Sequence, residues 1–209
     1  GEIIPKISGI DHNYSGFEND EFKFPSNCPE CGTMLVKLDS EANFYCTNTK
    51  GCRPQVIGKI QHFVSRKAMN IDGLGDETIK LLYNKGYLKD ISDIYNLDYN
   101  SISLIEGHAD KSVDNLKMGI ENSKSKPFQK VLYGLGIRYV GESASRKILK
   151  KIKSIEELML MDLESLSKID EIGEKTAASI SEFFKDENNR KLIDKLKSAG
   201  LVFIDDNKD

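Results

Sequence analysis

A short pattern recurs four times in the last two thirds of this 209-residue chain. The four copies end at positions 75, 109, 141 and 173, so successive copies are 34, 32 and 32 residues apart. Each copy opens with Ile. A small residue lies three residues after the last position of each copy, and an aliphatic residue lies seven residues after it. A repeat of this length predicts one supersecondary unit that is stacked several times. The copies are residues 71–75, 105–109, 137–141 and 169–173.

The repeat predicts a helix, a tight turn and a second helix. We expect the Ile to end the first helix and enter the core, and the turn glycines to let a partner approach closely. Backbone N–H groups at the start of the second helix point outward at the positive end of the helix dipole, where they can hold phosphate. Such a site needs no Lys or Arg, so a chain with a net charge of −3 could still bind nucleic acid. The alternative is an array of helical hairpins that binds protein.

All four cysteines lie within 25 residues, in the pattern C-x2-C-x14-C-x5-C. The first pair, with Pro and Gly beside it, predicts a tight knuckle, and a second pair completes the tetrahedron of a structural zinc site. Four thiolates leave no position for water, so the site is expected to hold shape and not to catalyse. Two disulfides of a secreted domain and an iron–sulfur cluster are the alternatives, although the N-terminus does not read as a signal peptide. The predicted zinc ligands are Cys28, Cys31, Cys46 and Cys52.

Composition and pattern place these motifs in a mainly α-helical protein. A hydrophobic content of 39% and a charged content of 30% are typical of a folded chain, and no apolar run is long enough for a transmembrane helix, so no membrane partner is expected. The expected divisions are a single strand at 1–10, a linker at 11–25, a zinc module with short strands at 26–55, a domain of four hairpins at 56–204 and a tail at 205–209. The hairpins are expected near 71–82, 105–116, 137–148 and 169–180.

These motifs resemble the helix-hairpin-helix motif of DNA-binding proteins, and their order resembles the bacterial NAD-dependent DNA ligases. CPECG and YCTNTKGCRPQ resemble the zinc finger of that family, and LYGLGIRYVGESAS and DEIGEKTAASISEFF resemble its third and fourth hairpins. The opening GEIIPKI resembles the closing strand of its OB fold. The resemblance implies a zinc finger and a tandem helix-hairpin-helix domain from an enzyme that seals nicks in duplex DNA. That enzyme uses NAD and Mg²⁺ and is cytoplasmic, associated with the bacterial nucleoid.

The catalytic lysine of that family lies in a Lys-x-Asp-Gly motif, which this sequence lacks. At 70–73 the chain reads Asn-Ile-Asp-Gly, and an amide cannot act as the nucleophile. The resemblance therefore implies a DNA-binding portion without a catalytic residue, inactive without the adenylation domain. Its expected partners are nicked double-stranded DNA and the adenylation, OB and BRCT-type domains of the same protein. A stand-alone helix-hairpin-helix repair scaffold and a protein-interaction module are the alternatives.

The resemblance also implies that the hairpins hold the DNA backbone from the minor-groove side, without sequence specificity. Tyr139 and Glu171 stand where the first copy has Gly73, and a carboxylate facing phosphate would repel it, so the fourth hairpin is expected to be mostly structural. Amides of Asp76, Asp110, Glu142 and Glu174 are expected near the phosphates. The predicted DNA-binding residues are Gly73, Gly75, Gly107, Lys111, Arg138, Gly141, Arg146, Lys147, Gly173 and Lys175.

Overall fold

The computed structural model of the chain describes residues 5–6, 8–9, 24–37, 42–105 and 110–205. These residues form two compact units, which comprise residues 1–47 and residues 48–209. Most of the strand expected at 1–10, nearly all of the linker expected at 11–25, and Gly107 lie outside the described residues. The predicted divisions of the chain therefore remain predictions.

A two-stranded antiparallel ribbon organises the described part of the first unit. β1 (Leu35–Lys37) pairs with β2 (Phe44–Cys46), and Leu35 lies opposite Cys46. These strands agree with the short strands expected in the zinc module. Two strands of this length are not stable in water by themselves. The ribbon therefore needs the cysteines around it to keep its shape.

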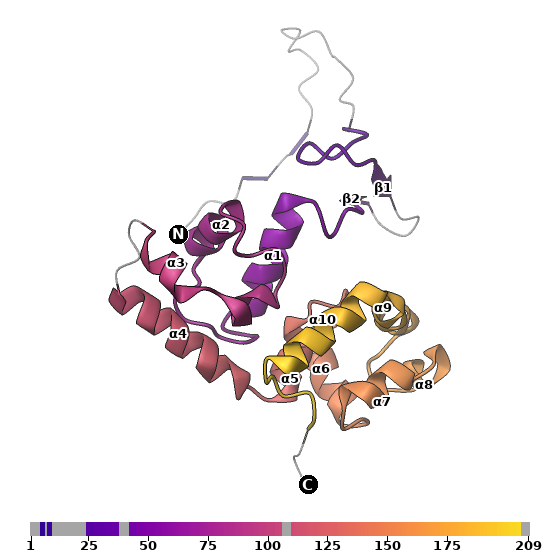
Figure 1. Cartoon of the computed structure of the whole chain (residues 1–209). Helices are drawn as coiled ribbons and strands as arrows, with labels where there is room; N and C mark the ends of the chain where they lie inside the picture. The colour runs from indigo at the N-terminus through magenta and orange to yellow at the C-terminus, as the bar shows by residue number, and fades with distance from the viewer. Residues whose placement is uncertain (1–4, 7, 10–23, 38–41, 106–109, 206–209) are drawn as a thin grey trace, which may run out of the picture. The chain divides into compact units, whose positions relative to one another are not determined.

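The first half of the second unit contains the first two hairpins, drawn from purple to magenta in Figure 1. In each hairpin the two helices pack against each other, α1 against α2 and α3 against α4. A turn of 3-10 helix, η1, lies between the hairpins. The elements are α1 (Arg53–Val64), α2 (Asp76–Asn84), η1 (Asp93–Asn96), α3 (Tyr99–Ser103) and α4 (Asp110–Lys124).

The second half contains the third and fourth hairpins and a closing helix, drawn from rose to yellow in Figure 1. Here α5 packs against α6, α8 packs against α9, and α10 packs against α9. Contact between α1 and α5 joins the two halves. The elements are α5 (Phe128–Gly134), α6 (Glu142–Leu149), α7 (Ile155–Leu160), α8 (Leu163–Ser167), α9 (Glu174–Lys185) and α10 (Glu187–Ser198).

Local sequence explains several of these helix boundaries. Helix α1 begins directly after Cys52 and has Pro54 in its first turn, where the missing N–H of proline is no loss. It therefore runs across the expected boundary between the zinc module and the hairpin domain. Helix α5 ends before Gly136, whose φ of +67° and N–H bond to the Tyr133 carbonyl form a left-handed cap. No helix in the described part of the chain is long and apolar enough to cross a membrane.

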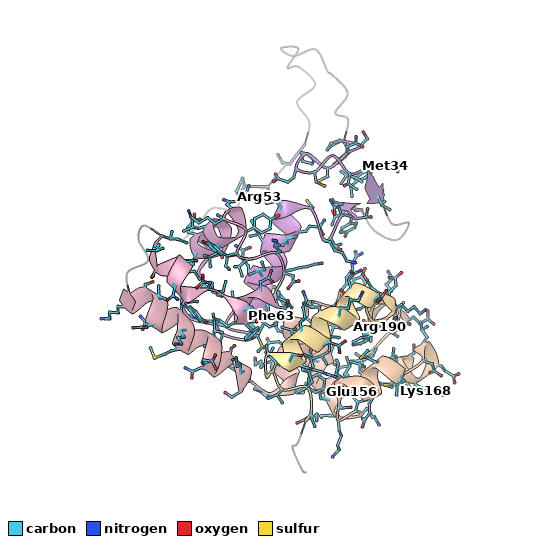
Figure 2. The ribbon with its side chains drawn as sticks, in the orientation of Figure 1. Met34, Arg53, Phe63, Glu156, Lys168 and Arg190 are labelled. Atoms are coloured by element: carbon cyan, nitrogen blue, oxygen red, sulfur yellow. The ribbon has the colours of Figure 1, made fainter. Side chains whose placement is uncertain are left out.

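The core of the second unit is built from the periodic aliphatic residues of the repeat. Seven residues after each copy ends, the side chain is at most 2% exposed. Burial of one such side chain stabilises the fold by about 1.5–3 kcal/mol. Phe63 of α1, which is fully buried, adds a large side chain to the same core (Figure 2). The four periodic residues are Leu82, Leu116, Ile148 and Ile180.

The Ile that opens each copy behaves differently from expectation in one respect. Ile71, Ile137 and Ile169 are all buried, as the repeat predicts. The prediction that each Ile ends the first helix was wrong, because α1, α5 and α8 end between two and seven residues earlier. The Ile therefore lies within the turn and fixes the turn to the core.

Candidate zinc centre and nucleic-acid interface

The four cysteine sulfurs converge on one point. All four Sγ atoms lie within 4.8 Å of one another, and Cys31 Sγ is 3.5 Å from Cys46 Sγ. A disulfide bond would be about 2.05 Å long. Two thiolates of a tetrahedral zinc ion with Zn–S bonds of about 2.3 Å are about 3.8 Å apart. The donor set and its spacing therefore fit a structural zinc site.

The knuckle that presents the first two ligands is held by backbone hydrogen bonds. Cys28 N–H donates to the Thr33 carbonyl, and Gly32 N–H donates to the Cys28 carbonyl, both at 2.8 Å. Gly32 adopts a φ of +71°, which glycine accommodates without strain. The Cys31 thiol lies 3.2 Å from Thr33 Oγ1. This side-chain hydrogen bond is the main reason that the pKa of Cys31 falls to about 6, which favours the thiolate that zinc requires.

The fourth cysteine lies where the helical domain begins. Cys52 is buried and is the N-cap residue of α1. The loop before it is held by two lysines. Lys50 Nζ lies 2.7 Å from the Asp186 carboxylate at the start of α10, and Lys59 Nζ donates to the Thr49 carbonyl at 3.0 Å. The Lys50 hydrogen bond holds the pKa of Asp186 well below its usual range.

Three hairpin glycines occupy equivalent positions and have no structural need to be glycine. Gly75, Gly141 and Gly173 immediately precede α2, α6 and α9, with φ of −71°, −85° and −76°. Any residue adopts such a backbone. A Cβ atom built at each position would meet no heavy atom within 4 Å. The fold therefore leaves open space at all three positions.

The same helices lack a side-chain cap, as do α1 and α5, whereas four other helices of the domain have one. Asp98, Ser154, Asp162 and Asp186 cap α3, α7, α8 and α10 by accepting a hydrogen bond from a first-turn N–H. No side chain does so at α2, α6 or α9. No N-cap side chain therefore competes with an external acceptor for the first-turn amides of these three helices. The N-cap of α4 lies outside the described residues.

Gly73 differs from these three glycines because the fold itself requires it. Its φ is +90°, and a Cβ there would lie 3.0 Å from the Cα of Leu116 in α4. On the other side of this contact, a Cβ on Gly119 of α4 would lie 2.6 Å from the Asp72 carbonyl oxygen of the turn. The turn of the first hairpin therefore packs directly on α4. A substitution of Gly73 would test packing and not DNA binding.

The residues that replace this glycine in later copies keep its backbone. Tyr139 has a φ of +65° and Glu171 has a φ of +62°, although neither is glycine. Tyr139 is 45% exposed, and the Arg138 guanidinium lies 4.9 Å from its ring centroid. Glu171 instead reaches back to α6, where it lies 3.1 Å from Lys147 Nζ and accepts a hydrogen bond from Ser143 Oγ at 3.3 Å.

The predicted basic residues are not equivalent in the structure. Lys147 is engaged by the fourth hairpin, because its Nζ also lies 2.7 Å from the Asp170 carboxylate. The Asp170 hydrogen bond and then that of Glu171 raise the pKa of Lys147, and Lys147 lowers the pKa of Asp170. The other four predicted basic residues are exposed: Lys111, Arg138, Arg146 and Lys175.

Glu142, whose amide is expected near phosphate, carries a carboxylate that is neutralised. It accepts a hydrogen bond from Lys130 Nζ at 3.1 Å and lies 3.9 Å from Lys67 Nζ. The Lys130 hydrogen bond is the main cause of its lowered pKa. Sequence reasoning missed both lysines, as it missed Asp170 and Ser143. No sequence signal identifies them, because each pair joins residues of different elements.

The chain thus combines a four-cysteine zinc finger with tandem helix-hairpin-helix units, and comparison with known proteins gives the same class. Residues 27–53 match the NAD-dependent DNA ligase C4 zinc finger domain, and residues 130–193 match a helix-hairpin-helix motif. The chain is 51% identical over 201 residues to a DNA ligase of Bacteroides fragilis, and this match covers 96% of the chain and 30% of that protein.

Two further DNA ligases show the same relationship. Identity is 46% over 209 residues with that of Phocaeicola vulgatus, covering 100% of the chain and 31% of that protein. Identity with the DNA ligase of Christiangramia forsetii is 48% over 201 residues, and this match covers 96% of the chain and 30% of that protein. The chain spans about a third of the length of these relatives. Its resemblance to the bacterial NAD-dependent DNA ligases is therefore confirmed for the segment that it covers.

Proposed function

We propose that this chain is the DNA-binding portion of an NAD-dependent DNA ligase, the enzyme that seals nicks in duplex DNA. In this proposal the hairpins hold the backbone of nicked DNA from the minor-groove side, in the bacterial cytoplasm at the nucleoid. The adenylation, OB and BRCT-type domains of the same protein are its partners. NAD and Mg²⁺ act outside this chain, which carries no Lys-x-Asp-Gly motif and is predicted to be inactive alone.

One observation carries the proposal. Gly75, Gly141 and Gly173 are open, uncapped and unstrained at the starts of three hairpin helices. An absent side chain that the fold does not require leaves room for a partner to reach the backbone. Phosphate oxygens fit that space, because first-turn N–H groups and the helix dipole favour an anion. Amide contacts of this kind read no bases, which suits an enzyme that must act at any nick.

The charged side chains of the third hairpin also support phosphate binding there. Arg138, four residues before α6, and Arg146, in its last turn, are both exposed. The carboxylate of Glu142 is paired with Lys130, so it does not oppose an incoming phosphate. We assign Lys111, Lys175 and the described turn glycines to the same surface, with Gly107 as the matching residue of the second hairpin. Gly73 takes part through its backbone, since its missing side chain serves packing on α4.

The zinc centre has a supporting role in this proposal. Zinc would close residues 28–52 into one module, because ligands on the knuckle, on β2 and before α1 share the metal. It supplies no chemistry to nick sealing, since four sulfurs fill its coordination sphere. In the parent protein we expect this module to set the angle between the OB fold and the hairpin domain.

The proposal is tested by filling one open glycine with a helix cap. Gly141→Asp should stabilise the fold by about 1 kcal/mol, because an Asp side chain caps α6 and complements its dipole. The same change should weaken binding to a nicked duplex at least about tenfold, since the carboxylate occupies the amides and repels phosphate. Gly141→Ser should stabilise the fold by only about a few tenths of a kcal/mol, because it caps α6 without adding a charge, and it should weaken binding less. The melting temperature measures the change in stability, and the dissociation constant, measured against salt concentration, gives the change in DNA binding.

Gly58→Ser is the matched control, because a Cβ on Gly58 in α1 also meets no heavy atom within 4 Å. It should leave DNA affinity and its salt dependence unchanged. A folded, zinc-loaded wild-type chain that shows no salt-dependent binding would refute the proposal and favour a protein-interaction module. Full affinity in Gly141→Asp would show that these amides do not hold phosphate.

A further inference from the structure

The turn of the third hairpin carries an aromatic side chain at a position where glycine suits the backbone better. Tyr139 has a φ of +65°, in the left-handed region that a bulky residue seldom adopts. The first hairpin places Gly73 at the equivalent position, with a φ of +90°. A tyrosine held in a disfavoured backbone conformation is a reason to look for a function of its side chain.

The Tyr139 ring is presented to solvent and not to the core. It is 45% exposed, whereas its neighbours Ile137 and Val140 are 4% and 5% exposed and hold the turn in place. The Arg138 guanidinium lies over the ring, 4.9 Å from its centroid. The turn therefore displays a flat apolar surface and a positive charge together, two residues before Gly141 at the start of α6.

This pairing suits the minor groove of duplex DNA. The groove is only about 6 Å wide, so a flat ring or guanidinium can enter it where a helix cannot. Its negative potential attracts Arg, and its walls are deoxyribose edges that offer apolar contact. Those edges are alike at every base pair, so the contact would read no sequence.

We propose that Tyr139 and Arg138 form a minor-groove contact, in which the ring packs against deoxyribose and the guanidinium lies in the groove. This inference rests on the proposed DNA-binding function and adds a second kind of contact to it. The amides of α6 hold phosphate, while the adjacent turn enters the groove that those phosphates border.

The matching residues of the other described turns do not offer this contact. Gly73 has no side chain and packs on α4. Glu171 points to α6, where its carboxylate meets Lys147 and Ser143. Among the described turns, the third hairpin alone therefore presents an aromatic ring.

Tyr139→Gly separates a groove contact from a role in folding. Glycine relieves the left-handed strain, so the melting temperature should stay the same or rise. Loss of the ring should lower affinity for a nicked duplex by about tenfold, which is within the range measured for loss of an aromatic contact to nucleic acid. The salt dependence of binding should not change, because tyrosine carries no charge. Arg138→Gln should instead reduce the slope of log affinity against log salt by up to about one.

A spectroscopic readout reports the contact directly. The chain has no tryptophan, so Tyr139→Trp introduces a single fluorophore at the turn. Its emission should be quenched or shifted when nicked duplex is added at low salt, and should recover at high salt. Leu160→Trp, at an 86% exposed position at the end of α7, is the control and should not respond.

The outcomes distinguish the two proposals. If the folded wild-type chain does not bind duplex DNA, the proposed function fails and this inference fails with it. If the wild type binds but Tyr139→Gly binds equally well, or Tyr139→Trp emission does not respond, only the minor-groove contact is refuted. If Tyr139→Gly unfolds the domain, the response of Tyr139→Trp alone decides between a groove contact and a packing role.

Discussion

The third and fourth hairpins share one backbone and use it differently. Tyr139 and Glu171 occupy the same turn position with almost the same positive φ, of +65° and +62°. The first is a half-exposed ring beside Arg138, and the second is a carboxylate bound by Lys147 and Ser143 of α6. One turn thus faces outward, while the other joins two hairpins. Repetition of a backbone does not imply repetition of a binding role.

The first hairpin has a third kind of residue, a glycine, at the same turn position. Gly73 shares the left-handed backbone, but a Cβ atom there would lie only 3.0 Å from the Cα of Leu116 in α4, so any side chain would press on the backbone of that helix. Packing therefore decides which copies can vary. A turn that lies against a helix must stay glycine, whereas a turn with free space can carry an aromatic or acidic side chain.

The largest expected effect comes from moving tyrosine to the first turn. Gly73→Tyr should destabilise the fold by about 3 kcal/mol or more, since its Cβ would lie 3.0 Å from the Cα of Leu116 and a bulky side chain cannot fit against α4. Chemical denaturation of the zinc-loaded chain measures this. Gly75→Ala is the control, because the added methyl group meets open space. A well-folded Gly73→Tyr would remove the distinction between the packed and the open turns.

A smaller effect is expected from breaking the junction between the third and fourth hairpins. Lys147→Met and Asp170→Asn should each lower the melting temperature. The fall in the double variant should be smaller than the sum of the two single falls, because the two side chains bind each other. Lys191→Met, at an exposed pair within α10, is the control. If the fall in the double variant equals the sum of the two single falls, this ion pair does not couple the hairpins.

The same junction predicts a dependence on pH. The pKa of Asp170 is lowered, so its contribution is present above its unfolded value of 3.8 and is lost as pH falls through the folded value. The pKa of Lys147 is raised, so its contribution is present below 10.5 and is lost as pH rises through the folded value. The stabilisation removed by Lys147→Met should therefore be constant near neutral pH and shrink at both extremes.

The smallest effect is expected at a buried serine of the third hairpin. Ser145 is fully buried, and no described group lies within hydrogen-bond distance of its hydroxyl. The fourth hairpin has Ala177 at the equivalent position, four residues after the glycine. Ser145→Ala should therefore raise stability, by about 1 kcal/mol at most. A loss of stability in thermal denaturation would reveal a partner for this hydroxyl, and Ser143→Ala should show no such gain.

The local patterns of the sequence predicted much of this structure. Spacing alone identified the cysteine cluster, and the repeat identified the buried aliphatic residues such as Leu82 and Ile148, because each depends on residues close in sequence. The same reasoning could not tell Gly73 from Gly75. Both are turn glycines, and only the position of Leu116 on a distant helix makes the first one obligatory.

Charge was harder to predict for the same reason. Lys147 belongs to a basic stretch that suggests contact with phosphate, yet two carboxylates from the next hairpin bind it. The partners lie more than 20 residues away, and nothing in the local sequence marks them. Lys50 and Asp186, which join the loop before Cys52 to α10, are further apart still. Such pairs follow from tertiary packing and cannot be seen as a pattern.

Cys52 belongs to the sulfur cluster and is also the N-cap residue of α1, and this has a consequence for the order of folding. Nucleation is the unfavourable step of helix formation, with a constant on the order of 10⁻³. Zinc bound at Cys52 would fix the residue from which α1 grows. During synthesis all four cysteines leave the ribosome before the hairpins do, so early metal uptake would seed the first helix of the domain and let the later repeats assemble on it in turn.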